Sequence, residues 1–242
     1  MAIDISLKEL LQSGAHFGHQ ARRWNPKMAP YLYGVEDGVH IFDLAKTKEA
    51  LEEALNILSQ ASKDGKVILL VGTKKQTKDK VKEIALACGI PYVCERWLGG
   101  TLTNFEQISR AIAKLKELKE KMAKGEYSKF TKKERLLIER DIERMEKFLG
   151  GISGLTGKPD LIFIVDTHKE IGAVKEAIKE KVILMGIVDS NSDPTLLDYP
   201  IPMNDDAVKA LEYVLDLVKE AIQEGKKKTT QKETKEIKKQ EE

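Results

Sequence analysis

Residues 67–77 read VILLVGTKKQT, and this stretch decides the fold class. Five consecutive apolar residues are followed at once by Gly72 and then by a helical pattern. A continuous apolar run is typical of a parallel strand that is covered on both faces. Two further runs have the same character, LIFIV at 161–165 and VILMGIV at 182–188. The chain therefore contains at least three buried strands of the parallel type.

Helical periods lie between these runs, as in residues 44–59 and 207–223, and weaker strand candidates occur at 39–42 and 91–94. Strands that alternate with helices are typical of βαβ units. The prediction is an α/β fold of the Rossmann-like class, with a mainly parallel sheet and helices on both faces.

Residues 103–149 break this alternation and predict a long helical hairpin. Thr103 with Glu106, and Thr131 with Glu134, have the spacing of capping boxes at two helix starts, and a turn is expected near Gly125. Apolar residues step by threes and fours along both arms, which favours an antiparallel coiled coil. Each arm would extend roughly 30 Å at ~1.5 Å per residue, so the hairpin should project from the sheet.

The predicted domain organisation follows from these patterns. Residues 1–102 and 151–224 form the sheet domain, 103–150 are the inserted hairpin, and the Lys/Glu-rich segment 225–242 is expected to be a disordered charged tail.

The 242 residues carry a net charge of +2, which hides a strong partition along the chain. Residues 101–150 sum to +4, whereas residues 151–224 sum to −7. One face can therefore touch a polyanion while another presents acid, because surface fields are local. No apolar run approaches the ~20 residues of a membrane span, and the start lacks a secretory signal, so a cytosolic location without membrane partners is expected. Cys88 and Cys94 are expected to be buried free thiols.

An α/β sheet invites an enzyme hypothesis, but the usual motifs fail. The chain has no G-x-G-x-x-G after a strand, no G-x-S-x-G elbow and no H-E-x-x-H helix. The run around Gly154 and Gly157 is not a P-loop, because its spacing is wrong and Pro159 stands where Ser or Thr would hold magnesium. A nucleotide- or phosphate-binding enzyme remains one alternative function, and a protein-interaction scaffold that uses the hairpin is another.

A cationic loop with interleaved aromatic residues is the first candidate RNA contact. Arginine forks suit phosphate and exposed rings can stack on bases. The loop residues predicted to bind RNA are Arg22, Arg23, Trp24, Asn25 and Lys27. The purely structural alternative is that Trp24 packs against the sheet.

Just before this loop, His16 and His19 have a spacing that could hold a metal, but structural histidines that bond backbone or RNA are favoured.

Two further segments are candidates for RNA contact. Lys74, Lys75 and Gln76 follow the strand at 67–71, at the ligand-binding end of a doubly wound sheet, where an anion is favoured. The second segment lies at the base of the hairpin and contributes Arg96, Trp97, Thr101, Thr103 and Asn104.

Five carboxylates and no Lys or Arg occur between residues 188 and 206. The end of one strand and the start of the last helix would bring Asp189 and Asp205 towards the same edge, where they could hold a divalent cation. A basic protein partner is the other possibility, with candidate contacts Asp189, Asp193, Asp205 and Asp206. The simpler explanation is that Asp193 sets a turn before Pro194 and that Asn204 or Asp205 caps the last helix.

Five runs, taken in order along nearly the whole chain, resemble the ribosomal protein S2 family of the bacterial small subunit. They are GAHFGH (14–19), RWNPKM (23–28), RWLGGTLTN (96–104), PDLIFIVD (159–166) and VDSNSDP (188–194). Only the tail after about Gly225 lacks the resemblance. It implies a flavodoxin-like sheet that carries a protruding helical hairpin.

The resemblance also implies a function. A structural, non-enzymatic protein is expected, which binds small-subunit ribosomal RNA, bridges the head and body of the subunit, contacts neighbouring subunit proteins and helps to anchor the large ribosomal protein S1 for initiation. It implies that the three cationic segments face RNA and that Asp189 and Asp205 serve a protein-facing or metal-assisted contact. No cofactor is required, a divalent cation is possible, and DNA is not an expected partner.

Overall fold

The structure is a computed structural model that describes residues 4–240, with side chains described for residues 4–227. Its centre is a five-stranded sheet in the order β5-β4-β6-β7-β8, in which every neighbouring pair is parallel. The strands are β4 (Ile68–Val71), β5 (Tyr92–Val93), β6 (Leu161–Ile164), β7 (Ile183–Val188) and β8 (Tyr199–Pro202). In chain order this is the 2-1-3-4-5 arrangement of flavodoxin-like sheets. The α/β class predicted from the sequence is confirmed.

Helices cover both faces of this sheet because successive strand residues point to opposite sides. Leu70 and Phe163 pack with one group of helices, α1 (Leu7–Gln12), α2 (Leu44–Lys63), α3 (Lys78–Cys88) and α7 (Val208–Gln240). Leu69 and Ile162 pack on the other face with α6 (Ile171–Glu180) and the base of α4 (Phe105–Ala123). Since burying one Leu or Ile contributes ~1.5–3 kcal/mol, these two apolar layers hold the fold together.

A second, smaller sheet is antiparallel and has the order β1-β3-β2. Its strands are β1 (Phe17–Gln20), β2 (Leu32–Glu36) and β3 (Val39–Phe42). The strand expected at 39–42 is present, but it pairs outside the parallel sheet. The reason is a tight turn at Asp37 and Gly38, which both have positive φ values, 49° and 77°. An Asp-Gly pair favours the type I′ hairpin, and this signal was missed.

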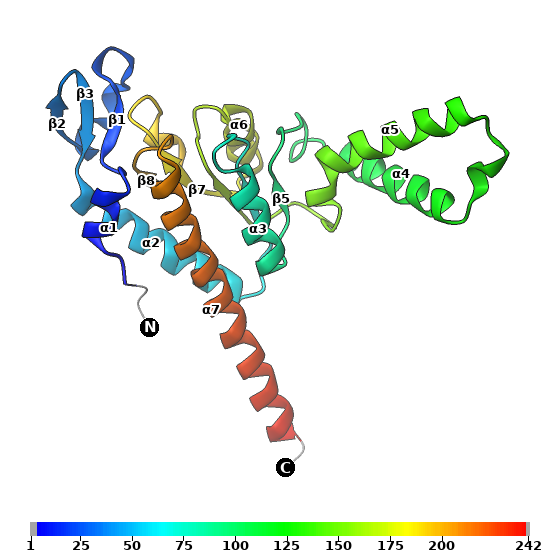
Figure 1. Ribbon diagram of the computed structural model, residues 1–242. Coiled ribbons are helices and arrows are strands. Elements are labelled where there is room, and N and C mark those ends of the chain that lie inside the picture. The colour runs from blue at the N-terminus through cyan, green and yellow to red at the C-terminus, as the bar shows by residue number, and fades with distance from the viewer. Residues whose placement is uncertain (1–3, 241–242) are drawn as a thin grey trace.

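The helices α4 and α5 (Lys132–Leu149) form an antiparallel pair that projects from the sheet body (Figure 1). The capping box of Thr131 with Glu134 is confirmed. The capping box expected at Thr103 is wrong, because Asn104 precedes α4 and the Thr103 hydroxyl donates to Glu176 on α6 instead. Burial is strongest at the root, where Ile108, Ile112, Leu115 and Leu149 are buried, and the distal apolar residues are only half-buried or exposed.

The C-terminal helix α7 continues to Gln240, through most of the segment expected to be a disordered tail. That segment is rich in Lys, Glu and Gln, which are good helix formers, and it contains no Pro. Residues 241–242 lie outside the described part. Both cysteines are free, with Cys88 buried and Cys94 half-buried. Among the described residues, no helix is both long and apolar enough to cross a bilayer.

Candidate functional site

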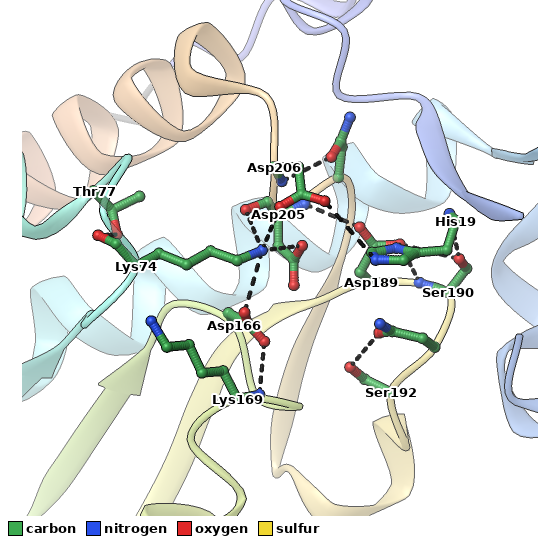
Figure 2. Close-up of polar contacts among 12 residues, drawn as sticks. His19, Lys74, Thr77, Asp166, Lys169, Asp189, Ser190, Ser192, Asp205 and Asp206 are labelled. Carbon is green, nitrogen blue, oxygen red and sulfur yellow. Dashed lines mark hydrogen bonds and ion pairs between the residues drawn. The ribbon is translucent and has the colours of Figure 1, made fainter. Parts of the chain in front are cut away.

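The carboxyl ends of the parallel strands converge on one lysine. Lys74 follows β4, and its Nζ lies 2.6 Å from Asp205 Oδ1, 2.7 Å from Asp206 Oδ1 and 3.2 Å from Asp166 Oδ2 (Figure 2). The Lys74 side chain is only 14% exposed. These four residues, with His19 and Asp189, are called the Lys74 cluster below.

The Asp189 carboxylate joins the antiparallel sheet to this edge. His19 Nδ1 on β1 lies 3.0 Å from Asp189 Oδ1, and the backbone N–H of Asp205 donates to Asp189 Oδ2 over 3.1 Å. The hydroxyl of Ser190 donates to the same carboxylate over 3.0 Å. The sequence placed Asp189 and Asp205 at one edge, and the structure brings them into contact.

The charges of the cluster satisfy one another. Burial alone would lower the pKa of Lys74, but hydrogen bonds to Asp205 and Asp206 and the charge of Asp166 raise it well above its ordinary value. Burial, together with repulsion from Asp189 and Asp166, raises the pKa of Asp205. The Lys74 ammonium therefore stays charged, and Asp205 accepts a proton more readily than an ordinary aspartate does.

One subset of these side chains has the donor atoms for a metal ion. A ring nitrogen of His19 and carboxylate oxygens of Asp205 and Asp206 lie within 4.8 Å of one another. Because Asp189 bonds Nδ1, it leaves Nε2 facing Asp206 at 3.8 Å. A carboxylate that orients a histidine in this way is common behind metal ligands. A cation here would have to compete with the Lys74 ammonium.

The crevice between β4 and β6 is the place where flavodoxin-like sheets bind ligands. Here it is filled by the chain itself. Glu170 is buried and accepts a hydrogen bond from the Thr73 hydroxyl, and Lys169 Nζ donates to the Thr73 carbonyl over 2.9 Å. Two carboxylates, Asp166 and Glu170, thus stand near the position that a phosphate would take, and the geometry disfavours the phosphate-binding alternative.

Three residues after β4 were predicted to bind RNA. Lys74 forms ion pairs within the cluster, whereas Lys75 and Gln76 are exposed. An RNA phosphate would have to displace three carboxylates to reach Lys74. Lys74 is therefore not part of the candidate RNA surface, whereas Lys75 and Gln76 remain part of it.

The loop between β1 and β2 presents most of its predicted residues to solvent. Arg22 and Arg23 are exposed, and within the described chain neither guanidinium forms an ion pair. Trp24 is 37% exposed and its ring packs 4.9 Å from His40, so it has both a packed and a free face. Asn25 accepts a hydrogen bond from the Lys27 backbone N–H. Lys27 Nζ lies 2.6 Å from Asp193 Oδ2, so a predicted RNA contact and a predicted protein contact bind each other.

The segment at the hairpin base divides into buried and exposed residues. Trp97 and Thr101 are buried, 8% and 1% exposed, so the expectation that they face RNA is corrected. The Trp97 ring N–H donates to Glu176 over 3.1 Å, and the Thr101 hydroxyl donates to the Leu98 carbonyl over 2.6 Å. Arg96, Thr103 and Asn104 are exposed, although Thr103 also bonds Glu176.

Glu176 on α6 was missed by sequence reasoning. Its carboxylate accepts hydrogen bonds from the backbone N–H groups of Gly100, Leu102 and Thr103. Burial acts in the opposite direction, but these bonds and that from Trp97 lower the pKa of Glu176. A charged residue beside the buried Ala173 and Ala177 of one amphipathic helix was the available signal. Glu176 fixes the segment that leads into the hairpin.

The tip of the hairpin was also missed as a distinct feature. Residues 121–135 contain six cations and two acids, so they account for the whole excess of charge in residues 101–150. Tyr127 and Phe130 form an edge-on ring pair with centroids 5.5 Å apart, and Phe130 is 45% exposed. The exposed cations at the tip are Lys124, Lys129, Lys132, Lys133 and Arg135.

The acidic segment does not form the protein-facing surface that was expected. Asp189 and Asp205 are each 1% exposed, because the cluster buries them, whereas Asp198 and Asp206 are exposed and Asp193 is half-buried. Asp193 accepts from the Thr195 backbone N–H and so sets the turn before η5 (Pro194–Leu196), as the simpler explanation required. Asn204 accepts from the Asp206 backbone N–H ahead of α7.

Fold and site together define a doubly wound α/β protein whose strand-end crevice is closed by its own ion pairs and which carries exposed cations on a loop and on a projecting hairpin. A model of the family described as Ribosomal protein S2 matches residues 10–225. The small ribosomal subunit protein uS2 of a Nitratiruptor species is 49% identical over 222 residues, which are 92% of this chain and 83% of the relative. That of Coprothermobacter proteolyticus is 45% identical over the same shares of both chains.

This chain belongs to the ribosomal protein S2 family. It is thus a structural ribosomal protein of the cytoplasm and not an enzyme, as the sequence predicted.

Proposed function

We propose that this chain binds small-subunit ribosomal RNA through two cationic regions, the loop at Arg22 and Arg23 and the hairpin tip at 121–135. One observation carries the proposal: the cations of the Lys74 cluster are neutralised internally, whereas those of the loop and tip are exposed. Exposed Lys and Arg bind phosphates by releasing counterions, so the affinity should fall steeply with salt. Specificity would come from RNA shape and from rings such as Trp24 that stack on unpaired bases.

The two regions lie at opposite ends of the molecule, with the small sheet at one end and the hairpin tip at the other (Figure 1). A rigid sheet body between them can hold two RNA segments at a fixed separation. This arrangement supports the further proposal that the protein bridges the head and the body of the small subunit.

Sedimentation of lysate on a magnesium-stabilised gradient tests the RNA-dependent role. The protein should co-migrate with the small subunit and leave it after ribonuclease treatment. Arg22→Ala with Arg23→Ala should lower the incorporated fraction at least threefold while the thermal midpoint stays unchanged. The matched control is Lys66→Ala with Lys158→Ala. It removes the same charge from residues that precede β4 and β6, at the amino-terminal ends of the parallel strands. Equal incorporation of the two double variants would contradict the proposed loop contact.

We also propose recruitment of S1 and contact with neighbouring subunit proteins, with Asp206 and Asp193 as the predicted partner residues that reach solvent. Asp206 is 56% exposed at the rim of the cluster. Asp206→Ala should weaken docking of S1 on purified subunits and leave RNA binding intact. Docking that is unaffected by Asp206→Ala would exclude this surface.

A divalent cation at His19, Asp205 and Asp206 is a second candidate function, favoured by the proximity of their donor atoms. The mixture of one imidazole and two carboxylates suits zinc. Titration calorimetry with zinc should show one site that is abolished by His19→Ala. Lys74→Met should tighten binding, because the competing ammonium is removed. If His19→Ala leaves the zinc isotherm unchanged, the metal assignment fails.

A further inference from the structure

A pocket of about 310 Å³ lies beside the cationic loop and next to the Lys74 cluster. It is at the carboxyl ends of β6 and β7. Its walls come from four segments: the loop at Asn25, the turn after β6, the start of α6 and the turn after β7 that runs into η5. This volume is at the lower end of the range for small-ligand sites, so it suits one ring system and not a whole nucleotide.

The pocket combines aliphatic walls with polar side chains. Ile171, Val174, Leu196 and Leu197 supply the apolar surface. The polar groups are the amides of Asn25 and Asn191, the hydroxyls of Thr167 and Ser192, and the His168 ring. The lining contains no Lys or Arg, and its one acid, Asp193, is paired with Lys27. A phosphate or carboxylate would find no counter-charge here, whereas a flat, neutral, hydrogen-bonding ring would find both walls and partners.

One polar group of the lining lacks a partner. The Thr167 side chain is 4% exposed, and its hydroxyl makes no hydrogen bond to any described residue. Buried hydroxyls are nearly always satisfied, so an unsatisfied one calls for an explanation. A ring edge seated against Thr167 would supply the missing partner after rotation of that side chain.

We propose that this pocket holds a single unstacked nucleobase. The inference rests on the proposed RNA binding, since the exposed Arg22 and Arg23 stand three and two residues before Asn25 and would hold the adjoining phosphates. Proteins that read single-stranded RNA splay a base out and bond its edges, and amide side chains are suited to both donor and acceptor positions on a base. Asn25 and Asn191 would bond the ring edge, and the aliphatic side chains would enclose its faces.

Base-specific chemical probing of ribosomal RNA in reconstituted small subunits tests this. Wild-type protein should protect one unpaired base from dimethyl sulfate or carbodiimide. Ile171→Trp fills the mouth of the pocket from a residue that is 39% exposed, so the fold should tolerate it. That variant should raise the reactivity of the protected base at least fivefold while its affinity for RNA falls by less than tenfold. Asn191→Leu, which keeps the volume and removes the amide, should give the same gain in reactivity.

Ile178→Trp is the matched control. Ile178 lies two turns further along α6 and is 47% exposed, but it does not line this pocket. It should leave every base as protected as with wild type. If Ile171→Trp and Asn191→Leu remain bound and change no base, the pocket assignment is overturned while the RNA-binding proposal stands. If wild-type protein does not bind the RNA at all, the proposed function itself fails.

A nucleobase could also come from a free nucleoside. Thermal stabilisation by millimolar adenosine, cytidine, guanosine or uridine separates the two sources. Stabilisation of the wild type but not of Ile171→Trp, with no protected RNA base, would keep the ligand chemistry and assign it to the free nucleoside. Ultraviolet cross-linking of residues 167–171 or 191–197 to a protein of the subunit and not to RNA would overturn the proposal.

Discussion

Lysine has opposite roles in two regions of this molecule. At the sheet edge, Lys74 is half-buried between three carboxylates, and its charge is neutralised by groups that follow different strands. At the hairpin tip, Lys129, Lys132 and Lys133 stand exposed on a segment with six cations and two acids. A buried charge must be paired to be tolerated, whereas an exposed one costs little and remains available to a partner. The first region therefore stabilises the fold, and the second is free to bind RNA.

The largest effect expected from this comparison is on stability. Lys74→Met leaves Asp166 and Asp205 buried without their counter-ion, which should cost about 3 kcal/mol of unfolding free energy. Urea denaturation measures this. Lys75→Met, which alters the exposed neighbour, should change the free energy by less than about 0.5 kcal/mol. A small effect at Lys74 would mean that the cluster does not hold the sheet edge together.

The root of the hairpin allows a test of intermediate size. Glu176→Gln keeps the shape but removes the charge that accepts three backbone N–H bonds, and should cost about 1.5–3 kcal/mol at neutral pH. The folded-state pKa of Glu176 is lowered, so its stabilisation is present above the ordinary value of 4.5 and is lost as the pH falls through the lower folded value. Urea titrations of wild type and Glu176→Gln should therefore converge as the pH falls through the lowered pKa of Glu176. A difference that is independent of pH would show that the carboxylate charge is irrelevant.

The hairpin tip should respond through binding alone. Replacing Lys129, Lys132 and Lys133 together by alanine should weaken RNA binding roughly tenfold near 0.1 M salt, and should lower the slope of log affinity against log salt by about one per lost phosphate contact. The unfolding free energy should stay the same within about 0.5 kcal/mol. Filter binding across a salt series measures both the affinity and the slope, and an unchanged slope would remove the tip from the RNA surface.

The smallest effect is local to the second arm of the hairpin. Thr131→Ala removes the cap of α5 and should destabilise its first turn by about 1 kcal/mol. Hydrogen exchange should accelerate at Lys132–Arg135 and stay unchanged in α2. Acceleration that spreads into the sheet would contradict this local effect and would show that hairpin and body unfold as one unit.

Sequence patterns predicted the elements that repeat locally and missed those that depend on distant partners. The strands at 67–71, 161–165 and 182–188 were found within one residue at either end, because parallel burial produces continuous apolar runs. β1, β2 and β8 were missed, since β1 and β2 have no buried residue and β8 contains two prolines.

The same limit applies to the site. That Asp189 and Asp205 would meet followed from their places at the end of a strand and at the start of the last helix, but their burial around Lys74 did not, because no local pattern reports an ion pair across 131 residues. The sequence pattern suggested that the Trp97 ring stacks on RNA bases. In the structure its N–H donates to Glu176, which is 79 residues away. The exposed Arg22 and Arg23 were predictable because a loop cation without a nearby acid has no partner to bury it.

The gradient of burial along the hairpin also sets its mechanics. Its root is packed against the sheet, and the 19-residue helix α4, which begins at this root, is about 28 Å long at ~1.5 Å per residue. On a lever arm of that length, a tilt of roughly 10° at the root sweeps the tip through about 5 Å, nearly one helical turn. Under the proposed RNA binding, the charged tip would capture phosphates over a wide target area before the body is seated, which would raise the rate of productive encounters.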